Sequence, residues 1–203
     1  FNVINPLMIK KYIEVANFLQ APIIIALAEA HIEYMELEEA LHAYKYYASK
    51  TNVPIILHLD HGQKVEVVKR AIDLGFPSVM IDGSMHDFDT NVNMTREIVK
   101  YSKSKDVAVE AEIGHVGAGE NYETDKSTDS IYTSVKEAIE FVKQTNVDSL
   151  AISIGTAHGH YKGIPKLNFD RLSDINNALH IPLVLHGGSS SGDDNLRKTI
   201  EFG

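Results

Sequence analysis

Residues 54–62 read Pro-Ile-Ile-Leu-His-Leu-Asp-His-Gly, a run of apolar residues that opens with a proline and closes on polar side chains. A nearly continuous apolar run of this length is typical of a parallel strand that is buried on both faces. Proline at the first residue of a strand removes no donor that the sheet needs. The stretch therefore predicts a buried parallel strand, with His58, Asp60 and His61 towards its carboxyl end.

The same pattern recurs along the chain and alternates with helical periodicity. The apolar runs that predict strands are residues 23–27, 55–59, 78–81, 107–112, 150–154 and 183–185, with a remnant of a further strand at residues 1–3. The stretches that predict helices are residues 36–49, 64–74, 90–102, 134–144 and 193–202. Strands that alternate with helices predict βαβ units and a parallel sheet, which is an α/β fold.

The composition excludes several classes of site. The 203 residues carry a formal net charge of −9 and no cysteine. A disulfide framework, a thiolate metal site and a cysteine nucleophile are therefore excluded, so that a metal would need His, Asp or Glu ligands. The acidic balance argues against a nucleic-acid or membrane-surface partner, and no apolar run approaches the ~20 residues that span a bilayer.

Polar residues follow five of the predicted strands at their carboxyl ends. In a barrel of parallel strands these ends meet on one face, where barrel enzymes place their chemistry. The polar strand ends are His58-Leu-Asp-His-Gly62, Asp82-Gly-Ser84, Glu110-Ala-Glu-Ile-Gly114, Gly155-Thr-Ala-His-Gly159 and His186-Gly-Gly-Ser189. Such side chains are costly to remove from water without partners, and a shared metal would stabilise them.

Three histidines on this predicted face are the candidate metal ligands: His61, His158 and His186. A single histidine at a strand end is more often a hydrogen-bonded structural residue, and we interpret His58 in that way. Glu110 and Glu112 share one face of a strand because side chains alternate with a period of two. Glu112 is nearer the carboxyl end and is the better site candidate.

Glycines flank the two later histidines and indicate an anion site. Glycine allows close approach of the backbone, and successive backbone N–H groups can form an anion nest. Lys162 and Ser189 are donors nearby in the sequence. A glycine after a strand can also simply turn the chain, so both interpretations stay open for Gly155, Gly159, Gly187 and Gly188.

Four segments, taken in order, resemble the class II fructose-bisphosphate aldolases, a family that includes tagatose-bisphosphate aldolases. Residues 54–62 resemble the first signature of the family, and Val109-Glu-Ala-Glu-Ile-Gly-His-Val-Gly-Ala-Gly-Glu120 resembles the second. Ile154-Gly-Thr-Ala-His-Gly-His-Tyr-Lys-Gly163 and Pro182-Leu-Val-Leu-His-Gly-Gly-Ser189 are similar to its two later histidine segments. The resemblance extends over essentially the whole chain.

The resemblance implies a role for each matched residue. The residues that match the zinc ligands of the family are His61, His158 and His186. The residues that match its alternative metal position are Glu112 and Asp82. The residues that match contacts to the substrate, its phosphate or a monovalent cation (Na⁺ or K⁺) are Asn2, Gly159, Lys162, Gly187, Gly188 and Ser189. Asp60 matches the catalytic acid–base, and Glu120 matches the loop glutamate that moves the carbon-bound proton of the substrate.

The chain departs from the family pattern after the last histidine segment. Ser190 and Ser191 stand where the family commonly has a glycine and a hydrophobic residue. The segment expected for the eighth strand is absent from these residues. Since a (β/α)₈ barrel typically has ~250 residues, we expect residues 1–203 to form a single aldolase barrel domain that is truncated at both ends, without most of strand 1 and without strand 8.

The implied activity is the metal-dependent, reversible cleavage of fructose 1,6-bisphosphate to dihydroxyacetone phosphate and glyceraldehyde 3-phosphate. The resemblance also implies a cytoplasmic homodimer or homotetramer that binds phosphorylated ketoses and triose phosphates, with neither nucleic acid nor membrane as a partner.

Three alternatives stay open. Gly155-Thr-Ala-His158 and Pro165-Lys-Leu-Asn-Phe-Asp-Arg171 are similar to the tagatose-bisphosphate subgroup, whereas the pair His61-Gly62 is more similar to fructose-bisphosphate members. A zinc-dependent barrel hydrolase of the amidohydrolase type would show His-x-His on its first strand, a spacing that residues 58–61 lack. A non-catalytic sugar-phosphate-binding protein would be expected to have lost Asp60 or a histidine, and none is lost.

Overall fold

The computed structural model describes residues 1–114, 117–118, 132–158, 161 and 163–203. The chain divides into two compact units. The first unit comprises Phe1–Asp82 and Glu97–Glu110, and the second comprises Gly83–Arg96 and Ala111–Gly203. The division falls inside one helix and one strand, so both units contain part of each. The prediction of a single domain over residues 1–203 stays a prediction.

Strands and helices alternate along the chain, as the sequence predicts. The strands are β1 (Ile23–Ala28), β2 (Ile55–Gly62), β3 (Ser78–Ile81), β4 (Ala108–Ile113), β5 (Gly117–Ala118), β6 (Ser149–Ile152), β7 (Ala157–His158) and β8 (Leu183–Val184). The helices are α1 (Pro6–Leu19), the short 3₁₀-helix η1 (Glu29–His31), α2 (Leu37–Ala48), α3 (Val65–Leu74), α4 (Phe88–Ser102), α5 (Val135–Thr145), α6 (Phe169–Ala178) and α7 (Asp193–Phe202).

The strands of the first unit follow the order β1-β2-β3-β4, and the pairs β1–β2 and β2–β3 are parallel. The register of the first pair places Ile23 opposite Ile55 and Ala28 opposite Asp60. The carbonyl of Pro54 accepts a hydrogen bond of 3.1 Å from Ile23 N, so this proline takes part in the sheet through its acceptor. The polar end of β2 therefore lies at the carboxyl edge of a parallel sheet.

The predicted strand remnant at residues 1–3 is confirmed as a parallel bridge beside β1. Asn2 is paired with Ala26, and Val3 N donates a hydrogen bond of 2.9 Å to the carbonyl of Ala26. This pairing places Asn2 at the edge of the sheet next to β1, from where its side chain reaches the candidate site.

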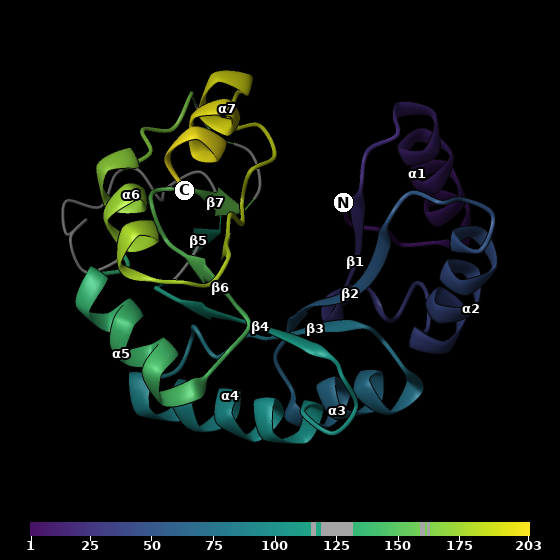
Figure 1. The fold of residues 1–203 in the computed structure, drawn as a ribbon, viewed down its shortest axis with the longest axis horizontal. Helices are drawn as coiled ribbons and strands as arrows, with labels where there is room; N and C mark the ends of the chain where they lie inside the picture. Colours follow the sequence, from purple (N-terminus) through teal and green to yellow (C-terminus); the bar gives the residue numbers. More distant parts are fainter. Residues whose placement is uncertain (115–116, 119–131, 159–160, 162) are drawn as a thin grey trace. The chain divides into compact units, whose positions relative to one another are not determined.

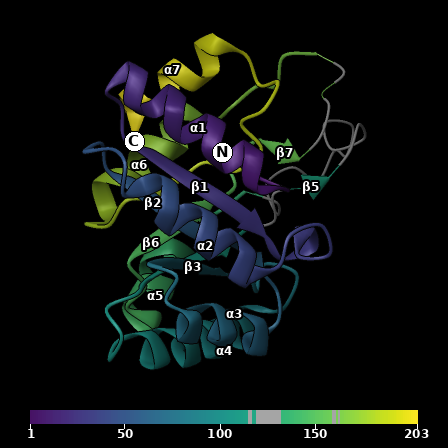
Figure 2. The same cartoon turned by 90° about the vertical axis from the view of Figure 1, so that its right-hand side faces the viewer.

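Helices α1, α2 and α3 pack on one side of β1, β2 and β3 (Figure 1), and α1 and α2 lie in front of β1 and β2 in Figure 2. The buried face of α3 consists of Val68, Ala71 and Ile72, as its apolar periodicity predicts. The helix ends at Gly75, whose φ of +96° is the left-handed conformation that glycine adopts readily.

The strands of the second unit follow the order β4-β6-β8, with a separate parallel pair of β5 and β7. Helix α5 begins with a capping box between Ser134 and Glu137. Its fully buried Phe141 packs edge-to-face on Phe88, with 5.9 Å between the ring centroids. The alternation of strands and helices confirms the predicted α/β fold class, that of a partial (β/α)₈ barrel.

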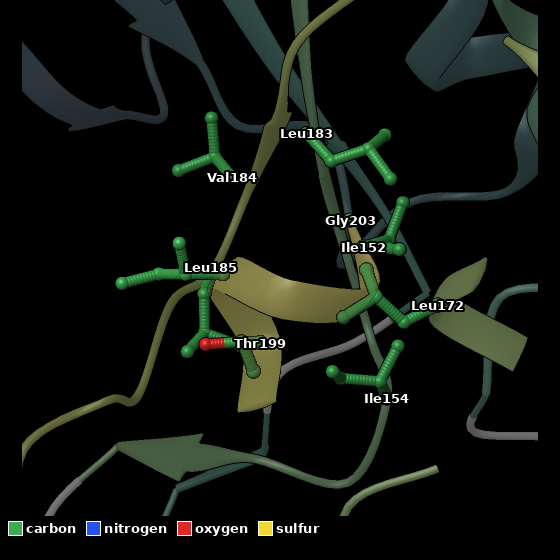
Figure 3. Close-up of a pocket in the computed structure, with 9 residues that line it drawn as sticks. Ile152, Ile154, Leu172, Leu183, Val184, Leu185, Thr199 and Gly203 are labelled. Carbon is green, nitrogen blue, oxygen red and sulfur yellow. The ribbon is translucent and has the colours of Figure 1, made fainter. Parts of the chain in front are cut away.

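An apolar pocket of about 230 Å³ lies between the end of α7 and strands β6 and β8. Figure 3 shows the residues that line it, which come from β6, α6, β8, α7 and the residues that directly follow β6, β8 and α7. The lining residues are Ile152, Ile154, Leu172, Leu183, Val184, Leu185, Thr199, Ile200 and Gly203. None of them is a predicted site residue.

In the part of the chain that it describes, the structure adds two α-helices that the sequence analysis did not predict, α1 and α6. Helix α1 is capped by Asn5, whose side chain accepts a hydrogen bond of 3.0 Å from Met8 N, and Pro6 lies in its first turn. Helix α6 is capped in the same way by Asn168, whose side chain accepts a hydrogen bond of 3.0 Å from Arg171 N. Within the described residues, no helix is both long enough and apolar enough to cross a membrane.

Candidate active site

The carboxyl end of β2 departs from regular strand geometry where it carries Asp60 and His61. The pairing of β2 with β3 shifts register between Leu59 and Gly62, and His61 has a φ of +45°. A positive φ is uncommon outside glycine, and such strain is often found at functional sites. Consecutive strand residues normally point to opposite faces, yet His61 Nε2 lies only 3.9 Å from Asp60 Oδ1. The irregularity therefore brings two neighbouring side chains to one place.

Two further side chains of the first unit are bonded to this strand end. Asn2 Nδ2 donates a hydrogen bond of 2.7 Å to Asp60 Oδ2. Nδ1 of His61 lies 2.7 Å from Asp82 Oδ2, which follows the neighbouring strand β3. The first unit thus brings together four of the predicted site residues: Asn2, Asp60, His61 and Asp82.

A second cluster of polar side chains lies on the same strands, around His58. Nδ1 of His58 is 2.8 Å from Ser78 Oγ, and its Nε2 is 3.7 Å from Glu110 Oε2. Both His58 and Glu110 are buried. These contacts join β2, β3 and β4 beneath the strand ends and fit a structural role for His58.

Glu112 lies on the part of β4 that belongs to the second unit and is 1% exposed. Its backbone carbonyl accepts a hydrogen bond of 2.7 Å from Asn91 Nδ2. The next carbonyl, that of Ile113, accepts a hydrogen bond of 2.7 Å from Thr133 Oγ1. Two consecutive carbonyls at the end of β4 are therefore held by side chains.

Gly187, which directly follows His186, lies against the backbone of β7. Its φ is +69°, and a Cβ at this position would lie 2.7 Å from the carbonyl oxygen of Ala157. The hydroxyl of Tyr161 accepts a hydrogen bond of 2.6 Å from Ala157 N and donates one of 2.9 Å to the carbonyl of Gly187. The backbone beside His158 and the backbone beside His186 are thus tied together.

The turn after Gly188 contains the two serines that depart from the family pattern. Ser191 is fully buried, and its hydroxyl donates a hydrogen bond of 2.7 Å to the carbonyl of Gly188. Ser190 has a φ of +66°, and Ser189 is exposed. Ser191 therefore has a local structural role that the family pattern does not provide.

Several predicted site residues lie outside the described residues: Glu120, Gly159, Lys162 and the side chain of His158. Among the residues that these contacts add, Tyr161 lies in the segment Ile154–Gly163 that the sequence analysis names. Neither Asn91 nor Thr133 is identified by the sequence analysis. Both side chains donate to backbone carbonyls, and since every residue has a backbone carbonyl, no sequence motif marks such a contact.

The donor set fits zinc. Zinc is held by His, Asp and Glu side chains where cysteine is absent, and catalytic sites typically use three protein ligands. Histidines that bind metals commonly have a carboxylate on the other ring nitrogen, which sets the tautomer and orients the ring. Asp82 stands in that relation to His61, so that His61 is suited to bind a metal through Nε2.

The chain matches known aldolases over its whole length. The family model described as fructose-bisphosphate aldolase class-II matches residues 1–203. The YdjI aldolase from Escherichia coli K12 is 34% identical, with a TM-score of 0.88 over 100% of this chain and 71% of that one. A Coccidioides immitis protein provisionally described as a fructose-1,6-bisphosphate aldolase is 33% identical, with a TM-score of 0.87 over 100% of this chain and 72% of that one.

A more distant structure supports the fold alone. The fructose-bisphosphate aldolase from Campylobacter jejuni is 22% identical, with a TM-score of 0.79 over 100% of this chain and 68% of that one. The family match over all 203 residues and the two relatives above 30% identity decide the assignment. The chain belongs to the class II fructose-bisphosphate aldolase family, whose members are lyases that act on sugar phosphates.

Proposed function

We propose that the protein cleaves fructose 1,6-bisphosphate reversibly into dihydroxyacetone phosphate and glyceraldehyde 3-phosphate, with zinc held by His61, His158 and His186. The observation that carries the proposal is the end of β2, where Asp60 adjoins His61 and Asp82 holds the ring of His61. When bound, zinc would polarise the substrate carbonyl as a Lewis acid. The choice of the three histidines rests on the family resemblance.

Asp60 is the proposed acid–base group. Its carboxylate is buried, and one of its oxygens accepts the hydrogen bond from Asn2. Such a bond orients the carboxylate and directs its other oxygen, Oδ1, towards the side of His61. In cleavage Asp60 takes the proton of the C4 hydroxyl, and in condensation it returns that proton.

The remaining roles follow the matched positions of the family. Glu120 moves the proton on the carbon next to the carbonyl of the triose. Glu112 and Asp82 offer carboxylates for an alternative position of the metal. The residues proposed to contact the substrate, its phosphate or a monovalent cation are Asn2, Gly159, Lys162, Gly187, Gly188 and Ser189.

Tagatose 1,6-bisphosphate is a second candidate substrate. Gly155-Thr-Ala-His158 and residues 165–171 are similar to the tagatose-bisphosphate subgroup. The two ketoses differ only in the configuration at C4, so discrimination depends on contacts to one hydroxyl group. Assembly as a homodimer or homotetramer and a cytoplasmic location are further proposals that rest on the family resemblance.

The test is to measure initial cleavage rates on both ketose bisphosphates with zinc present, following the triose phosphates that are released. The proposal expects a higher kcat/KM on fructose 1,6-bisphosphate. A higher value on tagatose 1,6-bisphosphate would replace the substrate within the same reaction. Binding of both sugars without cleavage would instead support a non-catalytic sugar-phosphate-binding protein, and release of inorganic phosphate would support a hydrolase.

A further inference from the structure

Two buried side chains that lie outside the strand donate hydrogen bonds to the backbone at the carboxyl end of β4. Asn91 Nδ2 donates to the carbonyl of Glu112, and Thr133 Oγ1 donates to the carbonyl of Ile113, each at 2.7 Å. Asn91 is 4% exposed and Thr133 is 1% exposed. We refer to these two side chains and their two hydrogen bonds as the β4 clasp.

We propose that the β4 clasp is a positioning device for the active site, in which Asn91 and Thr133 fix the backbone that carries the carboxylate of Glu112. The proposal rests on the proposed function, because it takes Glu112 to serve the metal. Neither Asn91 nor Thr133 touches the reacting atoms in this proposal, and both act through Glu112.

The position of Asn91 is set by several contacts. A Cβ at Gly83 would collide with the side-chain amide of Asn91, so the absence of a side chain at Gly83 makes room for that amide. Thr95 Oγ1 donates a hydrogen bond of 3.3 Å to Asn91 Oδ1, which leaves the NH₂ group directed at Glu112. The backbone N–H of Asn91 donates 3.0 Å to the carbonyl of Asp87 at the start of α4. Asn91 therefore links the turn that follows Asp82 to the backbone of Glu112.

Three further hydrogen bonds hold Thr133. Its hydroxyl accepts a hydrogen bond of 3.0 Å from Ser153 N, and its own N–H donates one of 3.1 Å to the carbonyl of Ser153. Arg171 Nη1 donates a hydrogen bond of 3.1 Å to the carbonyl of Thr133. One hydroxyl thus joins the end of β4 to the backbone that follows β6.

The clasp matters because it adds two side-chain hydrogen bonds at Glu112 and Ile113, the last two residues of β4, where the strand ends. A rotation of the peptide planes at Glu112 and Ile113 would swing the buried carboxylate of Glu112, and active groups need to be held within ~0.5 Å of their productive positions. Outer-shell partners of metal sites typically contribute ~10–100-fold in metal affinity or activity when they are removed. We expect removal of a hydrogen bond of the β4 clasp to lower metal affinity or activity by a factor in that range.

The test compares three substitutions of buried threonines. Thr133→Val removes the clasp hydroxyl with little change in shape, Thr133→Ser retains it, and Thr145→Val is the matched control. Thr145 is also buried in the second unit, and its hydroxyl donates a hydrogen bond of 2.8 Å to the carbonyl of Phe141, within α5. Co²⁺ affinity, measured by competition with a chelator, and kcat at saturating Co²⁺ are the two readouts.

Thr133→Val is expected to lower Co²⁺ affinity or kcat by ~10–100-fold, whereas Thr133→Ser and Thr145→Val stay near the unsubstituted protein. In a Glu112→Gln background, Thr133→Val should add less than about threefold, because coupled residues are not additive. An equal effect of Thr133→Val with and without the Glu112 carboxylate would overturn the proposal, and so would equal behaviour of Thr133→Val and Thr145→Val.

Two further arms keep the test decisive. Asn91→Ala enters the same cycle with Glu112→Gln, so the proposal can be judged even if Thr133→Val does not fold. If the unsubstituted protein binds Co²⁺ but cleaves no ketose bisphosphate, the proposed function fails, while the affinity cycle still decides whether the clasp acts through Glu112.

Discussion

Asp82 Oδ2 lies 2.7 Å from Nδ1 of His61. The two residues follow neighbouring strands, and the contact depends on the register shift in β2 and on the positive φ of His61. A carboxylate in this position fixes one ring nitrogen and directs the other towards a metal. The strand irregularity is therefore a structural condition for the proposed chemistry.

Replacement of Asp82 by alanine should weaken metal binding. The ring of His61 would lose the partner that fixes its orientation, and loss of such a partner typically costs ~10–100-fold in metal affinity. Metal affinity measured by chelator competition checks this. Asp89→Ala, a change at an exposed carboxylate of α4, is the control and should leave the affinity unchanged. Equal affinities of the two variants would contradict the role of Asp82.

Replacement of Asp60 by asparagine should abolish most of the cleavage while the metal is retained. General acid–base catalysis typically contributes ~10²–10⁴-fold, and asparagine keeps the shape of the side chain beside Asn2. Kinetics and metal content are measured on the same sample. A fall in kcat of less than about tenfold, well below that range, or a parallel loss of metal, would remove Asp60 from proton transfer.

Replacement of Gly187 by alanine should destabilise the protein. The φ of +69° and the close carbonyl of Ala157 both oppose a side chain, and a non-glycine residue held in such a conformation costs about 1–3 kcal/mol. Urea unfolding measures the loss. Gly163→Ala is the matched control, since a Cβ there meets nothing within 4 Å, and it should shift the free energy of unfolding by no more than about 0.5 kcal/mol. Similar shifts for both variants would argue against the close approach at Gly187.

Asp73 gives a prediction for pH. Hydrogen bonds from Lys105 and Tyr101 hold the pKa of the Asp73 carboxyl below its usual range. Because the folded-state pKa is lowered, the stabilisation is complete above the pKa of an unfolded aspartate and is lost as pH falls through the lowered value. Lys105→Met should raise the pKa of Asp73 in an NMR titration of its carboxyl carbon. The group is exposed, so the effect on stability should be small. An unchanged pKa in that variant would show that Lys105 is not the cause.

Much of the fold could be predicted because the chain carries local signals for it. Apolar runs that follow prolines predicted β1, β2 and β8, and the predicted helix over residues 64–74 ends beside Gly75, as α3 does in the structure. Helix α4 starts at Phe88, two residues earlier than predicted, because Asp87 accepts a hydrogen bond of 3.0 Å from Thr90 N and caps the helix. The cap at Asp87 is a sequence signal that lies outside the predicted range 90–102.

The candidate site could be predicted only in part. Residue types at strand ends pointed to Asp60, His61 and Asp82, and the structure of the first unit brings these three together. The irregularity at His61 could not be predicted, because a positive φ outside glycine leaves no sequence signal. Asn91 and Thr133 were missed because a bond to a backbone carbonyl depends on tertiary packing alone.

The most direct test of the account is the metal dependence of cleavage. The purified protein is treated with a chelator, its residual metal content is measured, and cleavage of fructose 1,6-bisphosphate is followed before and after Zn²⁺ is returned. The account predicts that cleavage disappears with the metal, returns with Zn²⁺, and is not restored in a His61→Ala variant. Full activity in the metal-free protein, or a covalent adduct with the substrate trapped by borohydride, would contradict it.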